Sequence, residues 1–335
     1  MKYIVDVVKS VPNGAYFNAM KKAPADVLKT LESIGAVPKF IRIPDNRLFS
    51  VIGGIFNTLR IALKLQSSDE LYIQGYGYYI SLLVKIAKIK HVRLNYIVHD
   101  LTFLRFGNTT ASGLEVSLLE SMDTIFVHTE AMANVVKNKG IEGELRIMHL
   151  FDYYSDDAMI DKFETLSMKN VIAFAGNLEK SVFLQTLSKC QIPSTIQYRL
   201  YGLLKDKSIT KNTQISYLGA FRPNQTGIVK AGWGLLWDGD SIDTCSGSLG
   251  EYLKINSSHK ISLYLACGMP VILWRQSSLA KWLSDKGVCV LIDSLSDIPN
   301  AVNGISEDKY SEMVDNARNL GEMLRQGALL KSLLK

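Results

Sequence analysis

The chain has 335 residues, of which 47% are hydrophobic and 21% are charged, and it carries a net charge of +6 with a pI near 8.9. This composition predicts a globular protein with two domains of ordinary size and excludes a disordered or fibrous chain. The basic excess is mild and contains no long lysine and arginine runs. We therefore expect anionic small molecules or an acidic membrane surface as partners, and no nucleic acid.

Short β-branched runs alternate with longer helical patterns along the chain. The strands predicted in the first half are Tyr3–Val8, Phe40–Ile43, Glu70–Gln74, Arg93–Val98, Thr124–His128 and Arg146–His149. Those predicted in the second half are Val171–Ala175, Gln197–Tyr201, Gln214–Leu218, Gly234–Trp237, Pro270–Trp274 and Val288–Ile292. The helices predicted between them include Ala23–Ile34, Gly53–Leu65, Ile80–Lys88, Leu114–Ser121, Glu130–Lys139 and Leu279–Lys286. This alternation indicates parallel sheets joined by crossovers, hence an α/β fold with two doubly wound, Rossmann-like domains.

The acidic, polar segment Phe151–Lys169 is predicted to link these domains. We expect an N-terminal domain at residues 1–152 and a C-terminal domain at 153–310. Helices at 311–335, with Gly321 and Gly327 as breaks, are expected to pack back on the first domain, or alternatively to form a homodimer. The cleft between two such domains, at the carboxyl ends of the strands, is the expected ligand site.

The cellular location is predicted from what the chain lacks. The N-terminus has a strand pattern rather than that of a signal peptide, and no run of about 18 uncharged apolar residues occurs, so we expect a cytoplasmic protein. The four cysteines have no metal-ligand spacing. Cys190, Cys267 and Cys289 are expected to be reduced core residues, whereas Cys245 lies in a polar loop, where a catalytic thiol is a less favoured alternative.

Residues 47–64 carry only basic charges beside large apolar side chains. The favoured interpretation is a domain helix whose apolar stripe packs on the sheet. The alternative is a basic amphipathic helix that makes a peripheral contact with the inner face of the plasma membrane.

The stretch Trp237–Lys260 is the densest polar cluster of the chain. It contains acids, hydroxyls, small residues and two lysines, and it leads into the apolar helix predicted at Ile261–Cys267. Glycines let backbone N–H groups approach a ligand, and a helix start concentrates unpaired N–H donors where an anion can bind. We therefore predict that Lys260 contacts a diphosphate, against the alternative of a solvated surface loop.

Two loops of the first half also follow predicted strands. The turn Ser10–Ala15, which contains Asn13 and Gly14, can place backbone amides near a ligand, together with Asn18. His99 and Asp100 close another strand and could supply a general base for a sugar hydroxyl. The alternatives are an ordinary turn and a buried histidine held by its own backbone.

In the second half, Phe174–Lys180 joins a strand to a helix through Gly176 and Asn177. Such a turn, with an early lysine, is typical of phosphate-binding loops, and Lys180 and Lys260 together could clamp a pyrophosphate. The sequence has neither a Walker lysine motif nor an intact Gly-x-Gly-x-x-Gly, which argues against an ATPase or an ordinary dehydrogenase.

These motifs resemble a known family. The block Trp237–Lys260, with Leu263-Tyr-Leu after it and Ala175-Gly-Asn-Leu before it, closely resembles bacterial β-1,6-galactofuranosyltransferases of O-antigen and capsule assembly. The stretch from His99-Asp100-Leu101 to Leu104-Arg105 resembles their first-domain motif. More distantly, the chain is similar to the streptococcal glucosyltransferase that extends glycans on adhesins.

The resemblance implies a GT-B glycosyltransferase, with two Rossmann-like domains facing across a cleft. It implies that the C-terminal domain binds a UDP-sugar donor, that the N-terminal domain binds the acceptor, and that neither a metal nor another cofactor is required. The implied donor contacts are Gly176, Asn177, Lys180, Asp238, Asp240, Ser246, Tyr252, Lys254, His259 and Lys260. The implied acceptor contacts are Asn13, Gly14, Asn18 and Arg105.

The expected reaction transfers galactofuranose from UDP-galactofuranose to a lipid-linked O-antigen, capsule or exopolysaccharide intermediate. Asp100, with His99 as second choice, is the expected catalytic base. The paired glutamates of many retaining GT-B enzymes are absent, because Ile255 and Leu263 occupy their places, and this leaves the stereochemistry open. The alternatives are a hexosyltransferase that uses UDP-glucose on a glycan or glycoprotein, and a non-catalytic nucleotide-binding partner of another transferase.

Overall fold

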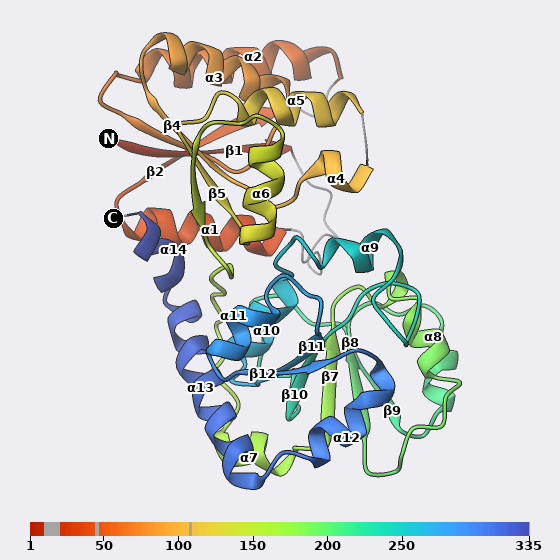
Figure 1. The fold of residues 1–335 in the computed structure, drawn as a ribbon. Coiled ribbons are helices and arrows are strands. Elements are labelled where there is room, and N and C mark those ends of the chain that lie inside the picture. Colours follow the sequence, from red (N-terminus) through yellow and green to blue (C-terminus); the bar gives the residue numbers. More distant parts are fainter. Residues whose placement is uncertain (10–20, 44–46, 107–108, 335) are drawn as a thin grey trace. The chain divides into compact units, whose positions relative to one another are not determined.

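The computed structural model describes residues 1–9, 21–43, 47–106 and 109–334 and contains two compact units (Figure 1). The described part of the first unit lies within residues 1–9, 24–148 and 330–334. That of the second lies within 21–23 and 149–329.

The first unit is built on a six-stranded parallel sheet. Its strands are β1 (Lys2–Lys9), β2 (Val37–Ile43), β3 (Glu70–Ile73), β4 (Arg93–Ile97), β5 (Thr124–Val127) and β6 (Glu144–Ile147). They are ordered β2-β1-β3-β4-β5-β6, and every neighbouring pair is parallel. All side chains of β5 are buried, as expected for a strand covered on both faces.

Helices cover both faces of this sheet. They are α1 (Lys22–Ser33), α2 (Arg47–Lys64), α3 (Tyr78–Ile89), α4 (Thr102–Phe106), α5 (Thr110–Leu119) and α6 (Glu130–Asn138). The helices α2, α3 and α5 lie on one face and α1 on the other (Figure 1). Threonine side chains cap two helix starts, since Thr109 accepts from Ser112 N and Thr129 from Met132 N.

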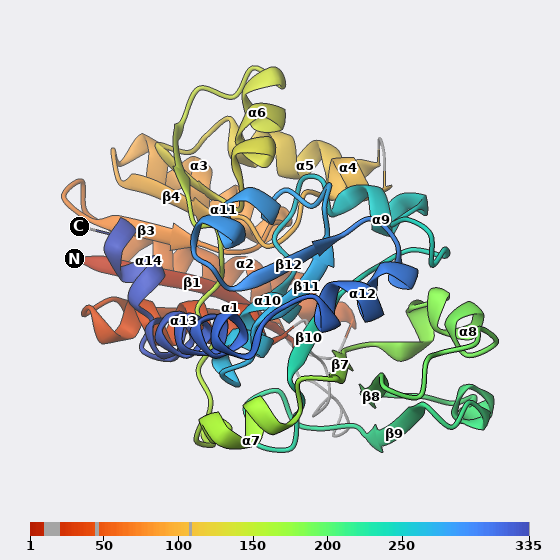
Figure 2. The same ribbon diagram turned by 60° about the horizontal axis from the view of Figure 1, so that its bottom comes forward.

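The second unit contains another six-stranded parallel sheet (Figures 1 and 2). Its strands are β7 (Val171–Ala175), β8 (Gln197–Tyr201), β9 (Ile215–Gly219), β10 (Trp233–Leu236), β11 (Val271–Trp274) and β12 (Cys289–Ile292). Their order, β12-β11-β10-β7-β8-β9, is that of the dinucleotide-binding fold, in which the strand order reverses beside the first strand. The reversal here falls between β7 and β10.

The helices of the second unit are shorter, apart from one. They are α7 (Lys162–Ser167), α8 (Phe183–Leu187), α9 (Gly247–Tyr252), α10 (His259–Ala266), α11 (Ala280–Asp285), α12 (Ile298–Asn303) and α13 (Glu307–Arg325), with 3-10 helices at Leu178–Lys180, Lys207–Lys211 and Leu295–Asp297. The last helix, α14 (Ala328–Leu333), begins in the second unit and ends in the first. The core of the second unit includes the fully buried Trp233, Trp237, Trp274 and Tyr264.

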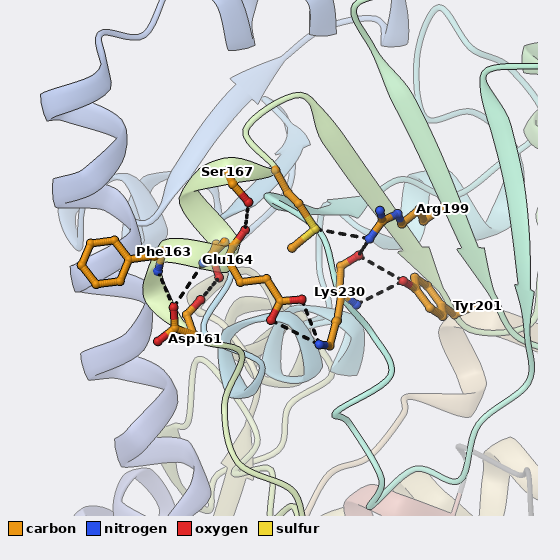
Figure 3. A network of polar contacts seen from close by, with 9 residues as sticks. Asp161, Phe163, Glu164, Ser167, Arg199, Tyr201 and Lys230 are labelled. Carbon is orange, nitrogen blue, oxygen red and sulfur yellow. Dashed lines mark hydrogen bonds and ion pairs between the residues drawn. The ribbon is translucent and has the colours of Figure 1, made fainter.

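A polar network holds together the segments that precede β7 and β10 (Figure 3). Asp161 caps α7 by accepting from Phe163 N and Glu164 N. Glu164 forms an ion pair with Lys230 at 2.8 Å, and the backbone carbonyl of Lys230 accepts from the Arg199 guanidinium at 2.9 Å. The network therefore lies at the amino end of β10, whereas Asp238 follows the carboxyl end of the same strand.

The twelve predicted strands and the α/β class are confirmed, with boundary shifts of a few residues. Helix α2 begins at Arg47 rather than Gly53, and the expected linker contains α7. The predicted break at Gly321 is wrong, because α13 is continuous through it. A Cβ at Gly321 would lie 2.0 Å from the Leu265 carbonyl oxygen, so this glycine permits close packing against α10 instead.

Among the described residues, no helix is both long enough and apolar enough to cross a membrane.

Candidate functional site

The strands β7 and β10 separate at their carboxyl ends. Their pairing extends only through Ile172–Trp233 and Ala173–Gly234. Beyond it, the buried Tyr264 hydroxyl bridges the two strands: it accepts from Ala175 N at 2.8 Å and donates to Leu235 O at 3.1 Å. Ligands of open parallel sheets bind at such a reversal of strand order. Tyr264, which sequence reasoning assigned no role, thus shapes the expected ligand site.

Three predicted residues meet at this point. Helix α10 begins at His259 and so carries Lys260 in its first turn, where the Nζ lies 2.8 Å from Asp238 Oδ1. The same ammonium lies 4.8 Å from the centre of the Phe174 ring, a cation–π contact. A Cβ on Gly176 would lie 3.2 Å from Lys260 Cε, and the φ of this residue is +142°. Position 176 therefore favours glycine, because its backbone conformation is strained for other residues and a side chain there would crowd Lys260.

The start of α10 adds positive charge beside the Lys260–Asp238 ion pair. The Lys260 and Asp238 side chains are 18% and 22% exposed, so their charges interact more strongly than in open water. The side chain of Ser258, the N-cap residue of α10, makes no capping hydrogen bond. The first N–H groups of α10 thus add a partial positive charge beside Lys260.

The loop after β7 is shaped by Asn177. Its Oδ1 accepts from Glu179 N at 3.1 Å and from Lys180 N at 3.3 Å, and thereby caps the 3-10 helix Leu178–Lys180. Asn177 therefore orients this turn, while the Lys180 side chain is exposed.

A second polar pair lies in the loop after β10, where the Ser246 hydroxyl donates to Asp240. The backbone of this loop is tightly folded, because a Cβ on Gly239 would lie 2.3 Å from Ser246 O. Burial raises the pKa of the Cys245 thiol to about 12, which disfavours a nucleophilic thiolate.

The structure also places three further donor candidates. Lys254 forms an ion pair with Glu251 at 2.6 Å, and Tyr252 is buried. The His259 ring stacks on Tyr153 at 4.9 Å. The contacts described above bring Gly176, Asp238 and Lys260 together.

Sequence reasoning missed Gly202, which follows β8 and supports the Gly176 loop. Its φ is +145°, and a Cβ there would lie 1.8 Å from Gly176 O. We expect Gly202→Ala to destabilise the second unit by more than about 3 kcal/mol, because backbone strain adds to a collision that must displace the loop. Urea unfolding would measure this loss.

The matched control is Gly219→Ala, since Gly219 closes the neighbouring strand with φ +94° and has no atom within 4 Å of its added Cβ. It should lose only the strain energy, about 1–3 kcal/mol. Equal losses in the two variants would contradict the proposed support of the Gly176 loop.

In the first unit, His99 and Asp100 follow the end of β4 after one intervening residue, Val98. The Gln74 amide donates to Pro24 O at 3.2 Å, which directs its Oε1 to His99 Nε2 at 3.1 Å. Since this amide oxygen can only accept, His99 Nε2 is the donor in this hydrogen bond.

A buried carboxyl, Glu115 of α5, was also missed, although an acid among the apolar residues of a predicted helix was a usable signal. It accepts from Thr102 N at 2.7 Å and Phe103 N at 3.3 Å, and so holds the start of α4 just after Asp100. Its pKa is raised to about 7. Burial is the largest cause, the hydrogen bonds act in the opposite direction, and the Asp100 charge adds a smaller increase.

We expect Glu115→Gln to change the pH dependence of unfolding. Between pH 4.5 and about 7 the folded carboxyl keeps a proton that the unfolded one has lost, so the native chain loses stability as the pH rises. The glutamine side chain at position 115 cannot titrate. Between pH 4.5 and about 7, the free energy of unfolding of the variant should therefore rise relative to that of the native chain by up to about 3 kcal/mol. Urea unfolding at several pH values measures the difference. For the exposed control Glu120→Gln, the difference in free energy of unfolding should not change with pH. A pH-independent difference for Glu115→Gln would contradict the prediction.

The acceptor candidates Asn13, Gly14 and Asn18 lie outside the described residues. Arg105 lies in α4, but its side chain is also outside the described part. These assignments stay predictions.

A cavity of about 490 Å³ lies at the amino edge of the first sheet, lined by Lys88, His91, Arg93 and Asp123 among others. None of the predicted site residues lines it. Within the described ranges, no three His, Cys, Asp or Glu side chains are grouped so as to hold a metal ion.

Solved structures share this fold over nearly the whole chain. Trehalose-6-phosphate synthase OtsA aligns with a TM-score of 0.62 and 11% identity, covering 99% of this chain and 98% of that one. Sucrose-phosphate synthase from Thermosynechococcus elongatus aligns with a TM-score of 0.58 and 12% identity, covering 99% and 98%. Two such sheets define the GT-B class, and the chain is a glycosyltransferase of this fold.

The chain belongs to the glucosyltransferase 3-like family, whose N-terminal and C-terminal domain models match residues 2–150 and 172–335. It is 26% identical to the β-1,6-galactofuranosyltransferase WbbI of Escherichia coli K12, covering 96% of this chain and 93% of the relative. It is 25% identical to Glucosyltransferase 3 of Streptococcus gordonii, covering 74% and 71%. The resemblance expected from the motifs is confirmed.

Proposed function

We propose that this glycosyltransferase transfers galactofuranose from UDP-galactofuranose to a hydroxyl of a lipid-linked oligosaccharide or glycan. The donor assignment rests on one observation: Lys260, in the first turn of α10, lies next to Gly176 where β7 and β10 separate. A lysine above a glycine turn at a helix start suits a diphosphate. Similarity to WbbI over nearly the full length supports the furanose donor.

In the proposed reaction the acceptor oxygen attacks C1 of the donor sugar, and the bond from C1 to the diphosphate oxygen breaks. Asp100, with His99 as second choice, takes the hydroxyl proton. Lys260 and Lys180, with the N–H groups of α10, stabilise the negative charge of the departing UDP. Because protein groups neutralise the leaving group, no metal is required.

A second candidate is transfer of glucose from UDP-glucose to a glycan or glycoprotein. The family models and the streptococcal Glucosyltransferase 3 relatives favour it.

The test is UDP release by the purified chain with a panel of UDP-sugars, in the presence of EDTA and with UDP-galactofuranose produced in place by a mutase. Release with the furanose donor alone supports the first candidate, and release with UDP-glucose supports the second. Dependence on added divalent cations would contradict the metal-independent mechanism. Binding of UDP without turnover of any donor, even with acceptor glycolipids, would contradict both candidates.

A further inference from the structure

Helix α2 presents a continuous apolar face to solvent. Of the sixteen exposed large apolar side chains in the described part of the chain, six belong to this helix, with exposed fractions from 40% to 77%. They are Val51, Ile52, Ile55, Phe56, Leu59 and Leu63. Their spacing places them along one side of the helix. Single exposed apolar residues are ordinary, but such a continuous group marks an interaction surface.

Packing on the opposite side holds this face outward. The Tyr79 hydroxyl donates to Ser50 O at 3.1 Å, and its ring lies so close to Gly54 that a Cβ there would be 2.4 Å away. At the C-terminal end, the ammonium of Lys90 binds the carbonyl oxygens of Ala62 and Leu65, both at 2.9 Å. The helix therefore cannot turn its apolar side inward without breaking these contacts.

The exposed charges on α2 and on the neighbouring helix α3 are all basic. Arg60 and Lys64 are exposed on α2, and the neighbouring α3 adds the exposed Lys85 and Lys88. Neither helix sequence contains an acidic residue. An amphipathic helix with large apolar residues beside lysine and arginine is typical of helices that lie on anionic bilayers. An interface between two copies would instead bring the basic residues of both together without acidic partners.

We propose that α2 docks the first unit on an anionic lipid bilayer, with Ile52, Phe56 and Leu63 in the acyl boundary and Arg60 and Lys64 at the headgroups. The favoured sequence interpretation, an apolar stripe packed on the sheet, is wrong for these six exposed side chains. The proposal goes beyond the proposed function and is tested without substrates, so a failed donor assay would leave it standing.

The experiment is flotation of the full chain with vesicles of phosphatidylglycerol and phosphatidylethanolamine, compared with vesicles of phosphatidylcholine. Binding should be at least about tenfold stronger to the anionic vesicles and should weaken with added salt. The double variant Phe56→Gln, Leu63→Gln should lower binding at least about tenfold. Arg60→Gln with Lys64→Gln should remove most of the preference for anionic vesicles.

The matched control is Phe163→Gln, because Phe163 is 78% exposed on α7 of the second unit and should not affect binding. Unfolding midpoints of all variants check that each is folded. The proposal is overturned if the native chain floats with neither vesicle, or if Phe163→Gln lowers binding as much as the α2 variant. It is also overturned if the native chain self-associates without lipid and the α2 variant abolishes that association, since a second copy would then cover the face.

Discussion

Replacing Lys260 with methionine should lower kcat/KM for the UDP-sugar donor by about 10²–10³, the usual effect of removing one group that stabilises charge developing in the transition state. Methionine keeps the apolar stem over Phe174 and removes only the ammonium. The affinity for UDP should fall as well, because the same charge binds the diphosphate before and after transfer. Steady-state kinetics and UDP titration measure the two effects.

The matched control for this variant is Lys230→Met. Lys230 and Lys260 each form a 2.8 Å ion pair in the second unit. Lys230 precedes β10, whereas Asp238, the partner of Lys260, follows this strand. Lys230→Met should therefore keep its donor kinetics. A similar loss in both variants would indicate a general disturbance of the second unit. Unchanged kinetics in Lys260→Met would reject the donor site at the separation of β7 and β10.

Replacing Asp100 with asparagine should lower kcat by about 10²–10⁴, the range for losing a general base, with little change in the KM for the donor. Asparagine has nearly the same shape but cannot take the acceptor proton. The Asp100 charge also raises the pKa of Glu115, so the variant should lower that pKa toward its usual range. Transfer assays with a glycan acceptor measure the rate, and pH-dependent unfolding reports the second effect.

Asp123→Asn is the control, because Asp123 lies at the opposite edge of the same sheet and accepts from Leu94 N at 2.7 Å. An asparagine oxygen can still accept that bond, so transfer should continue at the native rate. Normal transfer by the double variant Asp100→Asn, His99→Ala would reject both residues as the base.

The sequence-based prediction succeeded where periodicity decides structure. All twelve strands were predictable as short runs between helical patterns. The signal is clearest for fully buried strands such as β5, which carries apolar side chains on both faces. The position of Lys260 at a helix start was predictable for the same reason, since the polar loop ends where the apolar helical pattern begins. Gly321 shows the limit of such reasoning, because the same residue type permits either a break or close packing.

The α/β class and the chemical character of the donor loop were thus determined by the sequence alone, because both depend on local pattern and residue type. Only the tertiary structure decided which residues meet. Lys260 pairs with Asp238 across a separation of 22 residues, while His259, its neighbour in the chain, stacks on Tyr153. The bridge through Tyr264, the support of Gly176 by Gly202 and the outward face of α2 likewise depend on how distant elements pack. Spacing along one chain does not encode those contacts.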